Sequence, residues 1–180
     1  MLPTNLQEAK MTWLTHTTFA YLTAQILGLP PAPAILGSTA PDWGEDLLGI
    51  KEHRGKTHYI TLWSSLFLLT LVLYLGAPNG LAKTLFLNLL TFTLGGLSHL
   101  LLDALTVAGV PLGLNRTRIR IGGLITTGKL SEWIFLGLIL LILIPVKNSG
   151  LTLGLTNYKE LLKKGVIDKR EYKEHRLELL

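Results

Sequence analysis

The chain has 180 residues, of which 48% are hydrophobic and 16% are charged, and its formal net charge is +5. This charged fraction is well below the usual quarter of a soluble domain, and the mean hydropathy of +0.41 is typical of a membrane protein. The chain contains no cysteine, which excludes disulfides and thiolate metal sites, so any metal ligands must come from His, Asp or Glu.

Two apolar segments near the start predict a helical hairpin. The first, residues 12–27, is just long enough to cross a bilayer and stops at a Gly-Leu-Pro-Pro sequence. The second, residues 32–40, is too short to span and predicts a re-entrant segment. A hairpin of this kind would return Asp42 to the level of His16.

Three further apolar segments predict membrane-spanning helices. Residues 59–76 contain no charged side chain, and residues 81–107 return across the membrane after a turn. Residues 133–144 form the last predicted span, which ends at Pro145. A Gly-rich loop at residues 109–131 carries arginines at alternate positions, which indicates a short extended strand.

The expected fold is therefore all-α. We expect a polytopic helical membrane domain with a re-entrant hairpin over residues 1–147, carrying a metal site at one membrane face. Residues 148–180 are charged and have a helical pattern, so we expect a small C-terminal helical hairpin there.

His99 and Asp103 lie one helical turn apart inside the apolar segment 81–107, and no Asp or Glu occurs between Glu52 and Asp103. An ionisable pair at membrane depth costs a few kcal/mol unless something compensates it. A metal ion is the compensation that suits a histidine and a carboxylate best. For His99 taken alone, the alternative is a packed, hydrogen-bonded histidine.

The predicted topology brings other polar side chains to the same membrane face. The expected metal ligands are His16, Asp42, His58, His99 and Asp103. The expected ligands or proton-transfer groups of the second rank are His53, Asp46 and Glu132. Without cysteine this set suits Zn²⁺, with Mn²⁺ or Fe²⁺ as alternatives, and its size leaves room for one or two ions.

Several of these residues could also have a purely structural role, without binding a metal or a substrate. Asp42 could be only a turn residue after Pro41, and Glu132 could cap the last helix through its dipole. The basic residues could be ordinary loop charges of a membrane protein or could grip the phosphate of a substrate. The candidates for substrate binding are Arg54, Arg116, Arg118 and Arg120.

These polar segments resemble the YdjM-like family of membrane-bound, metal-dependent hydrolases over about residues 12–145. The matching residues are His16, Pro41-Asp42, His53-Arg54-Gly55-Lys56-Thr57-His58, Ser98-His99-Leu100-Leu101-Leu102-Asp103, residues 105–112, Arg118-Ile119-Arg120, Gly128 and Glu132. The resemblance implies a helical metal site of the kind also seen in zinc phospholipases and related nucleases. The second carboxylate that the family carries after Pro-Asp is displaced here to Glu45 or Asp46.

Residues 158–172 resemble the short C-terminal helical hairpin called SHOCT. Gly165 would end its first helix and Asp168 would cap the second. This resemblance implies an oligomer or a protein partner bound through the tail. Basic residues counted in the loops alone put the metal site in the cytoplasm, whereas a cytoplasmic tail puts it outside.

The sequence thus predicts an integral hydrolase of a bacterial or archaeal cytoplasmic membrane, which uses metal-activated water on a phosphoester or ester bond of a lipid or lipid-linked substrate. The alternative is a non-catalytic, metal-stabilised scaffold or envelope-complex component that recruits partners through its tail. A transporter ranks last, because the ligands gather at one end of the bilayer. Nucleic-acid binding is not expected, because the acidic and basic residues of the tail are interleaved.

Overall fold

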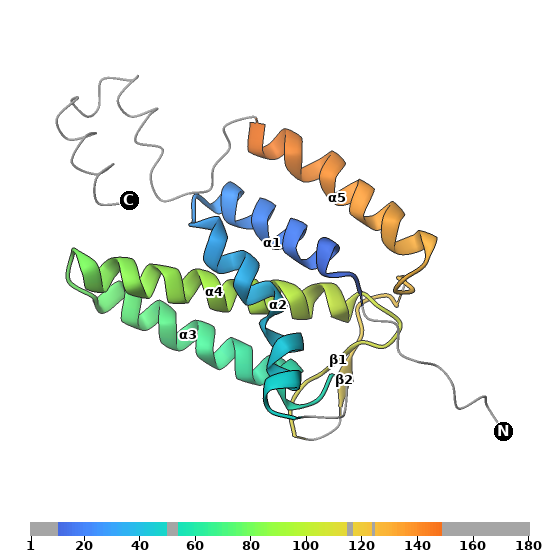
Figure 1. Cartoon of the computed structure of the whole chain (residues 1–180), viewed down its shortest axis with the longest axis horizontal. Helices are drawn as coiled ribbons and strands as arrows, with labels where there is room; N and C mark the ends of the chain where they lie inside the picture. Colours follow the sequence, from blue (N-terminus) through green and yellow to red (C-terminus); the bar gives the residue numbers. More distant parts are fainter. Residues whose placement is uncertain (1–10, 50–53, 115–116, 124, 149–180) are drawn as a thin grey trace.

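The computed structural model describes residues 11–49, 54–114, 117–123 and 125–148, and Figure 1 shows its architecture. The helices in this part are α1 (Trp13–Leu27), α2 (Pro31–Leu47), η1 (Lys56–His58), α3 (Ile60–Gly76), α4 (Leu81–Ala104) and α5 (Leu130–Asn148). Two short strands, β1 (Val110–Pro111) and β2 (Arg118–Ile119), pair in antiparallel fashion. The fold is thus mostly helical, as predicted. The expected SHOCT-like hairpin lies outside the described residues.

The helices pack in layers around α1 and α4. Helix α2 packs against both of them, α3 packs against α4, and α5 lies outside α1 (Figure 1). Helix α1 ends at Gly28, whose φ of 68° is left-handed, and the Leu29 N–H donates to the carbonyl of Ala24. Pro31 then opens α2, so the predicted doubling back of the first two segments is confirmed.

Helix α2 extends further than the sequence suggested. It continues through Pro41 to Leu47 instead of stopping before Pro41. Pro41 removes one helical hydrogen bond, but the packing of α2 against α1 and α4 holds the helix together on both sides of this residue. Helix α5 likewise continues beyond the expected stop at Pro145.

Two adjacent glycines let α2 and α3 approach α4 closely. A Cβ atom on Gly95 would collide with the carbonyl of Ala34 in α2, and one on Gly96 would collide with the ring of Trp63 in α3. Because of this approach, His99 reaches across to α2 and its Nδ1–H donates to the carbonyl of Ser38 at 2.6 Å.

Two of the described helices, Leu81–Ala104 and Leu130–Lys147, are long and apolar enough to cross a membrane. Helix α3 is apolar but shorter, at 17 residues. Helix α1 has 15 residues, about 22 Å of helix. It is not among these candidates, so the expectation that it crosses a bilayer is not supported.

Gly95→Ala is expected to lower the melting temperature of the detergent-purified protein. The added methyl group would push α2 away from α4, and overpacking of this kind costs about 1–3 kcal/mol. Gly137→Ala in α5 is the matched control, because a Cβ atom there meets no other atom within 4 Å. Circular dichroism melts of both variants measure the difference, and equal melting temperatures would contradict the close helix contact.

Candidate metal centre

A buried cluster of histidines and carboxylates lies where α1, α2, η1 and α4 meet. It contains His16 from α1, Asp42 from α2, His58 from η1, and His99 and Asp103 from α4. Each of these residues is at most 3% exposed. The structure therefore brings together all five residues that the sequence predicted as ligands.

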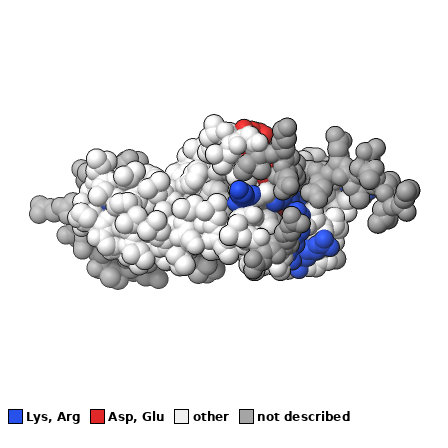
Figure 2. Space-filling model, turned by 90° about the horizontal axis from the view of Figure 1, so that it is seen from below, with Lys and Arg blue, Asp and Glu red and all other residues white. Residues whose placement is uncertain are grey.

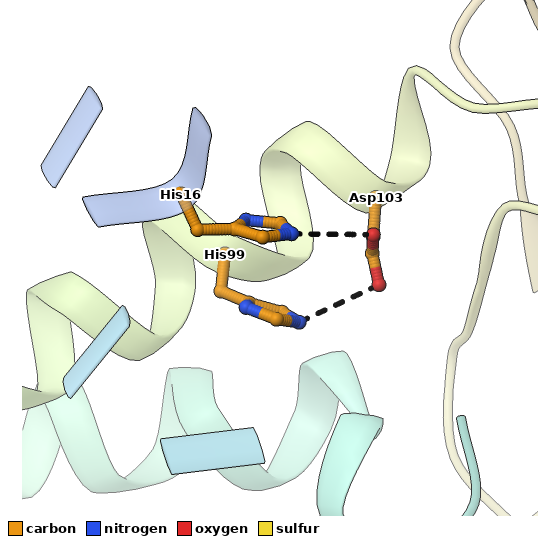
Figure 3. A group of neighbouring side chains, drawn as sticks. All are labelled: His16, His99 and Asp103. Atoms are coloured by element: carbon orange, nitrogen blue, oxygen red, sulfur yellow. Dashed lines mark ion pairs between the residues drawn. The ribbon is translucent and has the colours of Figure 1, made fainter. Parts of the chain in front are cut away.

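The atoms that face the centre of this cluster are separated by distances that suit a shared ion. His58 Nε2 lies 3.3 Å from His99 Nε2 and 3.6 Å from Asp42 Oδ1. Asp103 places one oxygen 3.5 Å from His99 Nε2 and the other 3.7 Å from His16 Nε2 (Figure 3). Two ligand atoms on a tetrahedral Zn²⁺ are about 3.3–3.6 Å apart, because the bonds to the metal are about 2.0–2.2 Å long.

Two of the histidines are oriented through their second ring nitrogen. His99 donates its Nδ1–H to Ser38, and His58 Nδ1 lies 2.9 Å from Glu45 Oε1. Both contacts occupy Nδ1, so in the neutral ring the proton lies on Nδ1 and Nε2 faces the cluster, which is the tautomer that binds a metal. Glu45 is itself held in place by the backbone N–H of Gly55 at 3.0 Å.

Each carboxylate of the cluster is also oriented by a donor on one oxygen. The indole N–H of Trp13 donates to Asp42 Oδ2 at 3.1 Å, and Arg54 Nη2 donates to Asp103 Oδ1 at 2.8 Å. The other oxygens, Asp42 Oδ1 and Asp103 Oδ2, lie 3.6 and 3.9 Å from His58 Nε2. Outer partners of this kind typically change metal affinity by 10- to 100-fold when they are removed.

His16 is placed by ring stacking. Its imidazole lies almost parallel to that of His99, with the ring centroids 3.8 Å apart and an interplanar angle of 15°. This stacking directs His16 Nε2 towards Asp103 Oδ1, which lies 3.7 Å away. His16 Nδ1 is buried and has no hydrogen-bond partner in the described part of the chain.

The cluster combines buried carboxylates with buried histidines. Asp42, Glu45 and Asp103 are buried, and Arg54 is the buried cation beside them among the described residues. Burial lowers the pKa of His58, but Asp42 and Glu45 raise it by more, so its pKa lies above the ordinary value. Buried imidazole nitrogens and carboxylate oxygens within 4.8 Å of one another are ligands that divalent metals prefer, and the residues present therefore fit a metal.

Two overlapping groups of buried side chains could hold the ion, namely His16 with His99 and Asp103, and Asp42 with His58 and His99. His99 belongs to both groups, and its Nδ1 is already bound to Ser38. His99 therefore offers one nitrogen to one ion, and we expect the two groups to share that ion. The nitrogen and oxygen ligands suit Zn²⁺, Mn²⁺ or Fe²⁺ and do not identify the metal.

Arg54 does not have the exposed position expected of a substrate-binding residue. It is 3% exposed, and its Nη1 donates to Thr106 Oγ1 and to the carbonyl of Gly109, both at 3.0 Å. Its backbone adopts a φ of 58°, which costs about 1–2 kcal/mol in a residue other than glycine. The guanidinium thus contacts other parts of the protein and orients Asp103, and these contacts give no support to substrate binding.

The structure brings Glu45, and not Asp46, to the cluster. Asp46 is exposed, whereas Glu45 is buried against His58. The buried positions of α2 form a helical stripe that continues from Asp42 to Glu45 and leaves Asp46 at its edge. The sequence left two candidates, Glu45 and Asp46, for the carboxylate that follows Asp42. A helix that continues through Pro41 places Glu45, and not Asp46, on the same buried face as Asp42.

Glu132 has contacts other than those of a metal ligand. Its Oε1 accepts hydrogen bonds from the Thr12 N–H at 2.7 Å and the Thr15 hydroxyl at 3.0 Å, and its Oε2 accepts one from the Gly128 N–H at 2.7 Å. These bonds fasten the start of α5 to the start of α1, directly before His16. Glu132 is therefore a positioning residue, and these contacts give no support to a role in proton transfer.

The remaining candidates lie outside the buried cluster. Arg118 and Arg120 are exposed on the loop that follows α4, and Arg118 confirms the predicted extended segment by pairing with β1. Figure 2 shows Lys and Arg side chains gathered mainly in one region of this face, whereas most of the other described residues in the view are uncharged. His53 and Arg116 lie outside the described residues, so their roles stay predictions.

Asp42→Asn is expected to weaken metal binding by more than about 100-fold, because it replaces a ligating oxygen and removes a charge from the cluster. Asp46→Asn makes the same chemical change one turn along the same helix, on an exposed side chain, and is expected to bind metal as the wild type does. Competition against a chromogenic chelator measures both affinities. Equal losses in the two variants would contradict the assignment of Asp42.

Glu45→Gln is expected to weaken metal binding by about 10- to 100-fold without abolishing it, since Glu45 acts on the metal through His58. Its effect should therefore lie between those of the two aspartate variants in the same assay. An undiminished affinity in Glu45→Gln would show that His58 needs no carboxylate to orient it.

One comparison with known proteins identifies a family. A family model described as YdjM inner membrane protein matches residues 11–161, which include every residue of the cluster. No curated protein and no solved structure matches the chain. The match covers well over half of the chain, and the chain therefore belongs to the YdjM inner membrane protein family.

Proposed function

We propose that this chain is a polytopic membrane hydrolase that cleaves a phosphoester or ester bond of a lipid or lipid-linked substrate with the help of a divalent metal, preferably Zn²⁺. The proposed ligands are His16, Asp42, His58, His99 and Asp103. The observation that carries the proposal is the convergence of these side chains at ligand spacing, with partners that orient four of them from behind.

When bound, such an ion supplies Lewis-acid chemistry, because it polarises the bond to be cut and lowers the pKa of a coordinated water towards about 7. The residues of the chain hold and orient this centre: Glu45 fixes the ring of His58, and Arg54 fixes the carboxylate of Asp103. The exposed Arg118 and Arg120 supply charge-assisted hydrogen bonds for a phosphate group. His53 stays a candidate for proton transfer.

A lipid substrate is supported by the surroundings of the cluster. The cluster lies at one end of α4, which is a candidate membrane span, and the family is one of inner membrane proteins. Exposed apolar side chains such as Leu114 and Val107 lie in the same loop region as the two arginines. A surface with both apolar and basic side chains suits a molecule with hydrocarbon chains and a phosphate.

A metal-stabilised membrane scaffold is the second candidate, and the burial of the cluster favours it. All five proposed ligands are at most 3% exposed, and the indole of Trp13 covers Asp42. A structural metal site is coordinatively closed, whereas a catalytic one keeps a position open for water and substrate. Under this proposal the protein would bind metal tightly and hydrolyse nothing.

The hydrolase proposal predicts activity that depends on metal. Purified protein in mixed micelles with phospholipids labelled in the head group or acyl chain should release product, lose this activity after chelation and regain it with Zn²⁺. Asp103→Asn should lower kcat/KM by about 1000-fold or more, while Asp46→Asn should keep it. Activity that survives both chelation and Asp103→Asn would exclude the proposed centre, and a metal-loaded but inactive protein would favour the scaffold.

Arg118→Gln and Arg120→Gln are each expected to raise KM for a substrate with an anionic phosphate by about tenfold, because each removes one charge-assisted hydrogen bond. The kcat should change little, since the arginines bind the ground state and the transition state alike. Lys129→Gln, which removes an exposed charge from the same loop, is the control. A fall in kcat at unchanged KM would contradict this role.

A further inference from the structure

A second site lies away from the metal cluster, in a groove between α1 and α5 that α2 closes on one side. The groove has a volume of about 580 Å³. Its aliphatic lining consists of Leu22, Ile35, Leu140 and Ile144, and four polar side chains, Thr17, Thr18, Tyr21 and Lys147, also face it. Lys147 belongs to the last turn of α5, at the end of this helix opposite to Glu132 and the metal cluster.

The position of the groove favours an apolar occupant. Helix α5 is a candidate membrane span, and its outer face carries exposed Ile134, Leu138 and Leu141. In a bilayer, an apolar groove on such a helix borders hydrocarbon and not water. An empty apolar groove would lose dispersion contacts along its whole lining, so a flexible hydrocarbon chain is the natural filling.

Lys147 and Tyr21 indicate the chemistry of the head group. The Lys147 ammonium lies 5.5 Å from the centre of the Tyr21 ring. In the described part of the chain, Lys147 has no carboxylate partner and the Tyr21 hydroxyl has no hydrogen-bond partner. An ammonium and a phenol hydroxyl beside each other offer charge and donors to a phosphate oxygen. Basic pockets between membrane helices bind the phosphate groups of anionic lipids in this way.

Lys83 is a lysine of the same molecule whose ammonium has a hydrogen-bond acceptor. Its ammonium also lies over a tyrosine ring, that of Tyr74, at 4.3 Å. It additionally donates a hydrogen bond to the carbonyl of Tyr74 at 2.8 Å, which ties it to the end of α3. Lys147 has a longer ring contact of 5.5 Å, makes no such bond within the described residues, and faces a groove.

We propose that this groove binds one anionic phospholipid, with an acyl chain along Leu22, Leu140 and Ile144 and the phosphate on Lys147 and Tyr21. The site is separate from the proposed hydrolytic centre, since Lys147 lies at the opposite end of α5 from the metal cluster. The lipid would therefore belong to the other leaflet from the substrate and would act as a bound structural lipid that holds α5 against α1.

Native mass spectrometry of the full chain in a neutral detergent tests this proposal with two probes of equal chain length, phosphatidylglycerol and phosphatidylcholine. The wild type should bind phosphatidylglycerol more tightly. Lys147→Gln should weaken that binding about fivefold and remove the preference, because the attraction of one lysine to an anionic lipid corresponds to about a fivefold change in affinity. Lys83→Gln, which removes a lysine of similar ring contact, should leave both affinities unchanged.

A second pair of variants tests the acyl-chain part without changing charge. Leu140→Trp fills the groove and should weaken the binding of both lipids, whereas Leu141→Trp, on the exposed face of α5, should weaken neither. If Lys147→Gln fails to fold, the lipid affinities of the two tryptophan variants still test the proposal.

Three results would overturn the proposal: equal affinity of the wild type for the two lipids, equal effects of the two lysine variants, or no difference between the two tryptophan variants. A groove filled by another part of the chain would leave the wild type without bound lipid, which also contradicts it. Metal content measured in the same samples should match the wild type in every variant, so a failure here leaves the hydrolase proposal unaffected.

Discussion

The structure depends on the burial of three carboxylates together with three imidazoles in an apolar helical protein. Asp42, Glu45 and Asp103 lie beside His16, His58 and His99, and the Arg54 guanidinium donates to Asp103. Buried carboxylates are costly unless cations join them. A divalent ion removes this cost, and the spacing of the imidazole nitrogens and carboxylate oxygens matches its coordination shell.

The fold is built so that these groups meet. The turn at Gly28 sends α2 back along α1, and Gly95, which has no side chain, lets α2 lie against α4. This contact gives His99 a backbone carbonyl for its second nitrogen. Glu132 fastens the start of α1 from the other side and so fixes the helix that carries His16. The contacts that pack α2 against α4 and α5 against α1 therefore also help to orient His99 and His16.

Much of the centre could be predicted from the sequence, because polar side chains in apolar segments are few and a hairpin was the simplest way to unite them. The direction of each side chain could not be predicted. Arg54 looked like a surface charge, and only its left-handed backbone and its three bonded acceptors show that it points inward. The choice between Glu45 and Asp46 depended on a helix that continues through a proline, against the local preference of that residue.

The most direct test of this account is the metal content of the detergent-purified protein, measured by mass spectrometry of the elements together with X-ray absorption at the edge of the bound metal. The account predicts one equivalent of a divalent metal in the wild type, with nitrogen and oxygen ligands at about 2.0–2.2 Å. It also predicts that His99→Ala loses this metal, because His99 belongs to both candidate ligand groups. Unchanged metal stoichiometry in His99→Ala, or a wild type that holds no metal, would contradict it.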